Sequence, residues 1–136
     1  MPNARNKNIS VVITPGAVPP FGLQHNHAHP PKQTVRFHNG GHPGVMVYFN
    51  ILDGHNTDIE FQPVPDNALR VDNPPNGNQL VPLSVEQDGN QLIAYCRNLV
   101  KEQFKFTLRF RRPDGNGGWQ DIDYDPIGDG NNGLRL

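Results

Sequence analysis

The stretch Phe104-Lys-Phe-Thr-Leu-Arg-Phe110 alternates apolar and polar side chains over its whole length. Successive side chains of a strand point to opposite sides of a sheet, so this pattern predicts a strand with one buried and one solvated side. The glycine-rich residues 114–118 then predict a turn, and residues 119–124 predict the next strand. We therefore expect an antiparallel hairpin over residues 104–124.

Similar runs occur along the rest of the chain and are separated by turn-forming residues. The other predicted strands cover residues 9–14, 34–37, 45–52, 58–62, 69–71, 83–87 and 91–97. The one helix candidate, residues 99–103, is too short to be stable by itself. About nine short strands without a long helix predict an all-β protein. The expected architecture is a two-sheet β-sandwich, immunoglobulin-like in the loose sense, with a small barrel as the alternative.

Length and composition limit the classes of protein to which this chain can belong. A length of 136 residues suits one domain, residues 1–136. The chain has 12 Lys and Arg against 13 Asp and Glu, a balance that argues against nucleic-acid and polybasic membrane partners. No apolar run reaches the length of a membrane-spanning helix, and the polar start lacks the apolar segment of a signal peptide. We expect a cytoplasmic protein.

Three histidines, His25, His27 and His29, alternate along a segment that precedes two prolines. In an extended chain they would share one face, and three imidazoles are suitable ligands for zinc, copper or nickel. The alternative is a solvated loop that binds metal only weakly, because no predicted strand holds these residues in place. We expect no resident metal and no cofactor. The single cysteine, Cys96, excludes an intramolecular disulfide and is expected to be a buried thiol.

Carboxylates gather toward the end of the chain. Asp121, Asp123 and Asp125 alternate and so share one face, either as mutually repelling groups or as a solvated edge. Glu102 has the spacing of the apolar series that begins at Phe104, so it lies on the core side or at the rim. An antiparallel hairpin with near-symmetric register brings Glu102 and Asp125 to the same end of the ladder.

Two carboxyl groups that share a proton can hydrolyse a peptide bond without a metal. One acid polarises the carbonyl group and the other activates water. This predicts Asp125 as the base and Glu102 as the acid, with Asp123 as a supporting residue.

Several short motifs resemble the DP-EP family of small bacterial β-sandwich proteins of poorly known function. They are the strand at residues 8–14, the strand end at residues 47–51, the Asp125–Pro126 dipeptide, and Glu102 followed by alternating apolar residues. The chain has Gln103 where that family has proline. The resemblance implies a β-sandwich, self-cleavage by an aspartic-type endopeptidase activity, and self-assembly.

Two functions follow from the sequence. The first is a self-cleaving aspartic-type endopeptidase that self-assembles, and the second is a non-enzymatic binding or assembly module that presents the His-rich and Pro-rich loops. Exposed sheet edges and a near-neutral charge favour a homo-oligomer in both cases.

Overall fold

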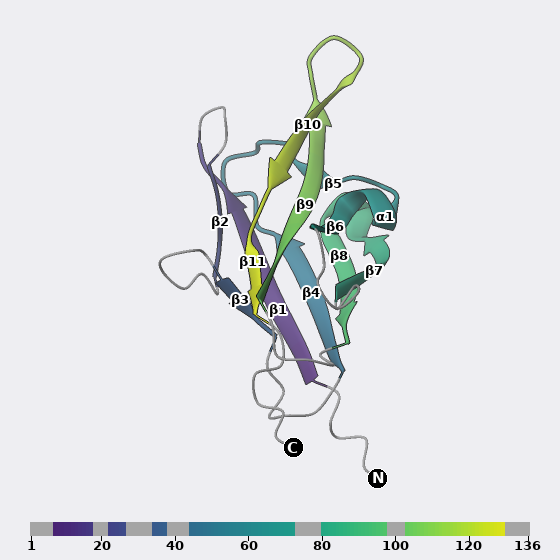
Figure 1. Cartoon of the computed structure of the whole chain (residues 1–136). Coiled ribbons are helices and arrows are strands. Elements are labelled where there is room, and N and C mark those ends of the chain that lie inside the picture. The colour runs from purple at the N-terminus through teal and green to yellow at the C-terminus, as the bar shows by residue number, and fades with distance from the viewer. Residues whose placement is uncertain are drawn as a thin grey trace, which may run out of the picture.

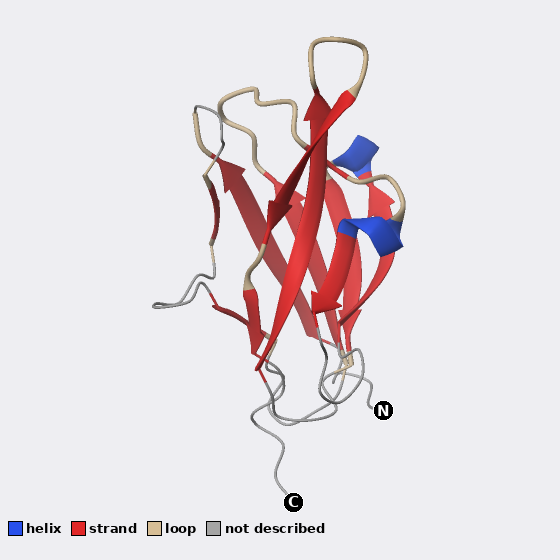
Figure 2. Cartoon of the chain, turned by 45° about the horizontal axis from the view of Figure 1, so that its top comes forward, coloured by secondary structure: helices blue, strands red, loops and turns tan. Residues whose placement is uncertain are grey.

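The computed structural model describes residues 7–17, 22–26, 34–37, 44–72, 80–97 and 103–129. Their strands form two sheets that pack face to face (Figure 1 and Figure 2). The sheets stay separate throughout the described residues, which confirms the predicted all-β sandwich and not the barrel.

The first sheet has five strands, and β1 and β4 lie in parallel at its centre while the other neighbours are antiparallel. The order across this sheet is β2 (Leu23–His25), β1 (Lys7–Pro15), β4 (Val45–Ile51), β8 (Gln91–Cys96) and β7 (Leu80–Glu86).

The second sheet is organised around its longest strand, β9 (Gln103–Pro113), which has partners on both sides. On one side lie β5 (Glu60–Phe61) and β6 (Leu69–Asp72), and on the other lie β10 (Trp119–Tyr124) and β11 (Ile127–Asp129). Strand β3 (Thr34–Arg36) then pairs with β11. A single-turn helix, α1 (Pro65–Ala68), and a 3₁₀ turn, η2 (Gln87–Gly89), complete the described elements.

The predicted hairpin of β9 and β10 is present, and its ladder continues beyond the predicted end. Tyr124 lies opposite Leu108 and Ile127 lies opposite Lys105, so the register is unchanged across the Asp125–Pro126 step. The Phe106 N–H donates to the carbonyl oxygen of Pro126 at 3.2 Å. Proline has no N–H to return this bond, and the ladder is therefore weakened at one position without a bulge.

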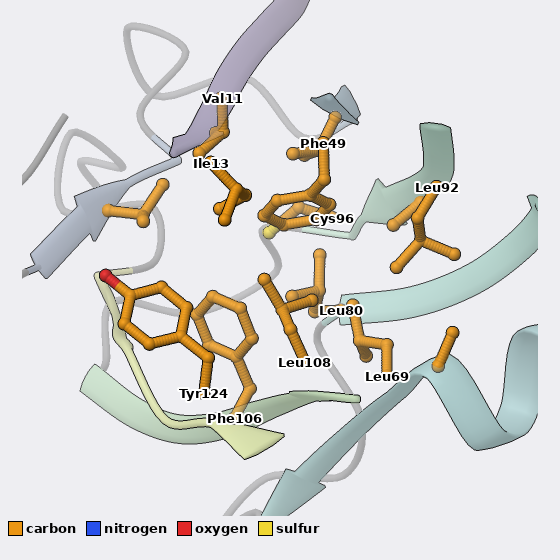
Figure 3. Close-up of a cluster of buried hydrophobic side chains, with 14 of the residues drawn as sticks. Val11, Ile13, Phe49, Leu69, Leu80, Leu92, Cys96, Phe106, Leu108 and Tyr124 are labelled. Carbon is orange, nitrogen blue, oxygen red and sulfur yellow. The ribbon is translucent and has the colours of Figure 1, made fainter. Parts of the chain in front are cut away.

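Inward-facing side chains of both sheets form one core (Figure 3). The apolar series of β9 lies wholly within this core, as its alternation predicts. The largest fully buried residues include Phe37, Phe49, Phe61, Phe106 and Phe110. Cys96 is also fully buried, which agrees with the expected core thiol.

Candidate functional site

The outward side of β5, β6, β9 and β10, together with Asp125 just after β10, is strongly charged, and we call it the charged face. Its cations lie mainly on β9, between carboxylates on the flanking strands. Its members are Glu60, Arg70, Asp72, Lys105, Thr107, Arg109, Arg111, Asp121, Asp123 and Asp125.

A carboxylate pair lies within this face around the hydroxyl group of Thr107. The Thr107 Oγ1 atom is 2.7 Å from Asp125 Oδ1 and 3.0 Å from Asp72 Oδ2. These two carboxylate oxygens are therefore at most about 5.7 Å apart, the sum of the two distances. Thr107 is only 2% exposed although it points outward. Arg70 holds the other oxygen of Asp72 at 3.0 Å.

Strand pairing explains why these groups meet. Thr107 and Asp125 are opposite each other in a pair without mutual backbone hydrogen bonds, because the neighbouring Phe106 bonds to Pro126. Side chains approach most closely at such pairs. Asp72 lies opposite Lys105 and reaches Thr107 diagonally across the sheet.

The Thr107 hydroxyl group has fewer hydrogen atoms than carboxylate neighbours. A threonine hydroxyl has one hydrogen, so it donates to only one of the two carboxylates. The carboxylate that does not receive this hydrogen has other donors, because Arg70 donates to Asp72 and Asp125 is exposed to water.

The other predicted catalytic residues have different surroundings. Glu102 lies outside the described residues, and its neighbour Gln103 is opposite Asp129. Asp129 is four residues from Asp125, roughly 13 Å along a strand. Asp125 therefore lies within the ladder and not at its end, because β11 extends the pairing. Asp123 faces Arg109 at 3.4 Å.

The predicted repulsion along the aspartate face is offset by partners on neighbouring strands. Asp121 accepts a hydrogen bond from Gln62 at 2.9 Å, and Asp123 and Asp125 have Arg109 and Thr107. Asp72 was not predicted, because it comes from a strand far away in the sequence and no local pattern indicates its partner.

His25 belongs to the core and not to a solvated loop. It lies on β2 opposite Ile13, is 6% exposed, and packs edge-on against Tyr124 with 5.8 Å between ring centroids. Burial also raises the pKa of Tyr124. His27 and His29 lie outside the described residues, and the described ones contain no group of three His, Cys, Asp or Glu able to hold a metal. The weak metal site stays a prediction.

Among the side chains that the structure describes, the outward side of β1, β4 and β8 carries no charged residue, and we call it the uncharged face. Ser10, Tyr48 and Ile93 form one row across it, and Gln91, Asn50 and Ser10 are joined by side-chain hydrogen bonds of 2.9 and 3.2 Å. Its members are Asn8, Ser10, Val12, Thr14, Met46, Tyr48, Asn50, Gln91, Ile93 and Tyr95. The apolar and aromatic members are half-buried.

The edge of this sheet at β7 is protected against strand addition. Pro82 lies within β7, and the register shifts between Pro82 and Ser84, where Leu83 is 50% exposed. Proline and bulges are devices that block edge-to-edge pairing. The edge-driven association expected from the sequence is therefore disfavoured at β7.

The loops beside β4, β5 and η2 form an acidic hollow lined in part by Asp53, Asp58, Glu60 and Asp88. Burial raises the pKa of Asp53, but backbone N–H groups of Thr57 and Asp58 donate to its carboxylate and bring the pKa below the usual value. Both Asp53 oxygens are thereby used to shape the loop.

No family model matches the chain, and no curated protein is similar to it in sequence. The DP-EP resemblance therefore stays a prediction. Within the ranges that the structure describes, no helix has the length and apolar content needed to cross a bilayer.

Proposed function

We propose that the chain is an assembly module that associates with a second copy of itself through the uncharged face. One observation carries this proposal. The chain has 12 Lys and Arg and 13 Asp and Glu, yet none of those whose side chains the structure describes occupies an outward position of β1, β4 or β8. Burying an unpaired charge is costly. Two uncharged faces can meet without that cost, and the charged face cannot.

The size of the face indicates the strength of association. Strands are about 4.8 Å apart and rise about 3.4 Å per residue, so the three strands of the uncharged face span roughly 14 Å by 20 Å. That is roughly 280 Å² per copy in projection, about a third of what a standard stable interface buries on each partner. We therefore expect a dimer that dissociates on dilution.

Sedimentation equilibrium on the full chain tests this proposal. Tyr48→Arg places a charge at the middle of the uncharged face, beside Ser10 and Ile93. Val64→Arg is the matched control, because Val64 is an exposed apolar residue elsewhere on the surface. The wild type and Val64→Arg should dimerise as concentration rises, and Tyr48→Arg should remain monomeric with an unchanged circular dichroism spectrum. A monomeric wild type, or dimerisation of Tyr48→Arg at the wild-type concentration, would contradict the proposal.

The carboxylate pair supports a second candidate function, acid-dependent cleavage of the protein's own chain. The protonated carboxyl group would polarise a peptide carbonyl group, and the ionised one would take a proton from the attacking water. The C–N bond then breaks, and the leaving amine receives a proton. In this proposal Asp125 is the base, as predicted from the sequence. Asp72 and Glu102 are the two alternative candidates for the acid.

Intact mass spectrometry of protein stored for days at mildly acidic pH with a chelator distinguishes the Asp125–Asp72 pair from the Asp125–Glu102 pair. Asp125→Asn should abolish cleavage. Loss of cleavage in Asp72→Asn but not in Glu102→Gln would identify Asp72 as the partner, and the reverse would identify Glu102. Asp121→Asn is the control, because Asp121 lies on β10 within the charged face and has no predicted catalytic role. A cut that occurs only at the Asp125–Pro126 bond and persists in urea is acid hydrolysis and not catalysis. A wild-type chain that stays intact would contradict the cleavage function, and assembly would then be the one proposed function that remains.

A further inference from the structure

The hairpin between β9 and β10 ends in an exposed Asn–Gly step. Residues 114–118 extend beyond the ends of the neighbouring strands (Figure 1), and Asn116 and Gly117 are both exposed. An added Cβ atom at Gly117 would meet nothing within 4 Å. The step is therefore open to water and to movement of the Asn116 side chain.

The hydrogen bonds of this tip join Asp114 to Gly118 and to the backbone of Asn116, and among the described residues they leave the Asn116 side chain and the Gly117 N–H unbonded. The Asp114 carboxylate accepts the backbone N–H groups of Asn116 at 2.7 Å and of Gly118 at 3.0 Å, and these bonds lower the pKa of Asp114. The Asp114 N–H in turn donates to the Gly118 carbonyl oxygen at 3.1 Å. Within the described part of the chain, the Gly117 N–H and the Asn116 side-chain amide have no hydrogen-bond partner.

We propose that Asn116 is a site of spontaneous deamidation. The Gly117 backbone nitrogen loses its proton to solvent and attacks the side-chain carbonyl carbon of Asn116. A carbon–nitrogen bond forms, the side-chain nitrogen leaves as ammonia, and a five-membered succinimide ring results. Water then opens the ring at either carbonyl group and leaves aspartate or isoaspartate at position 116. Ammonia is lost and water is gained, with no change of oxidation state.

Glycine at position 117 favours this reaction. It has no Cβ atom to obstruct the approach of its nitrogen to the preceding side chain, and its φ of +87° is one that other residues rarely adopt. The product places a second carboxylate beside Asp114, and isoaspartate also lengthens the backbone of the tip. Because the tip contributes no core residue and lies on the second sheet, the fold and the uncharged face should be unaffected.

Peptide mapping of native protein incubated in mildly alkaline buffer tests the proposal. The peptide that contains Asn116 should gain one mass unit with time and divide into aspartate and isoaspartate forms. Asn67, which precedes Ala68 within α1, is the internal reference and should remain intact. Gly117→Ala should slow the loss of the Asn116 amide, and Asn116→Gln should prevent it. An unmodified Asn116, or equal rates in the wild type and Gly117→Ala, would overturn the proposal, whatever the oligomeric state.

Discussion

The two outer faces of the sandwich are built by the same strand alternation, but one carries charged side chains and the other carries uncharged ones. On the charged face, cations of β9 lie between carboxylates of the neighbouring strands. Arg109 faces Asp123 at 3.4 Å, and Arg111 lies 3.7 Å from Glu60 and 3.7 Å above the ring of Trp119. On the uncharged face, hydroxyl, amide and aromatic groups take the place of charges. The comparison shows that the fold determines which residues face outward and not what those faces can bind.

The charged side chains of the charged face are paired with one another, and this makes the face a poor surface for association. Each exposed ion pair contributes little to stability in water, yet removing such charges from water has a large desolvation cost. The uncharged face has no such cost to overcome. This difference in desolvation is the physical basis of the proposed assembly surface.

The largest loss of stability is expected for a substitution in the core that the two sheets share. Phe106→Ala removes a fully buried ring from β9 and should lower the free energy of unfolding by about 3–5 kcal/mol in urea denaturation. Neither outer face is changed directly. A loss as small as that of an exposed substitution would show that β9 is not packed between the sheets as described.

One substitution made on each outer face sharpens the comparison. Thr107→Val leaves Asp72 and Asp125 facing a methyl group and should lower the free energy of unfolding by about 1–3 kcal/mol. Thr14→Val on the uncharged face is the matched control and should have little effect, because Thr14 is only half-buried and makes no hydrogen bond to another described side chain. Equal losses in the two variants would contradict the role given to the Thr107 hydroxyl.

The smallest effect is expected for a solvent-exposed ion pair. Asp123→Asn removes the partner of Arg109 and should change the free energy of unfolding by about 0.2–1 kcal/mol, less still in high salt. Thermal unfolding at two salt concentrations measures this change. A loss that matches that of Thr107→Val would mean that the charges of this face stabilise the fold cooperatively.

Local pattern was enough to predict most of the strands, the sandwich and the β9–β10 hairpin. Strands β2 and β11 were not predicted, because their three-residue sequences, Leu-Gln-His and Ile-Gly-Asp, show no clear alternation of apolar and polar side chains. The helix α1 is a single turn and shows no helical periodicity. The alternation also predicted that Asp121, Asp123 and Asp125 share one face, and all three lie on the charged face.

The partner of Asp125 could not be predicted in the same way. Asp72 meets Thr107 only because β6 pairs with β9, and this pairing joins segments that are more than thirty residues apart in the sequence. His25 was grouped with its neighbours by spacing, but tertiary packing against Tyr124 buries it. In both cases a long-range contact, and not local sequence, decides the chemistry of the residue.

A dilution series followed by nuclear magnetic resonance tests the proposed assembly surface most directly, because it reports which face changes. The methyl signals of Met46 and Ile93 should shift as concentration rises, while the backbone amides of Arg109 and Asp123 should not. Tyr48→Arg should abolish these shifts and Val64→Arg should preserve them. Shifts confined to the charged face, or signals that do not depend on concentration, would contradict self-association through the uncharged face.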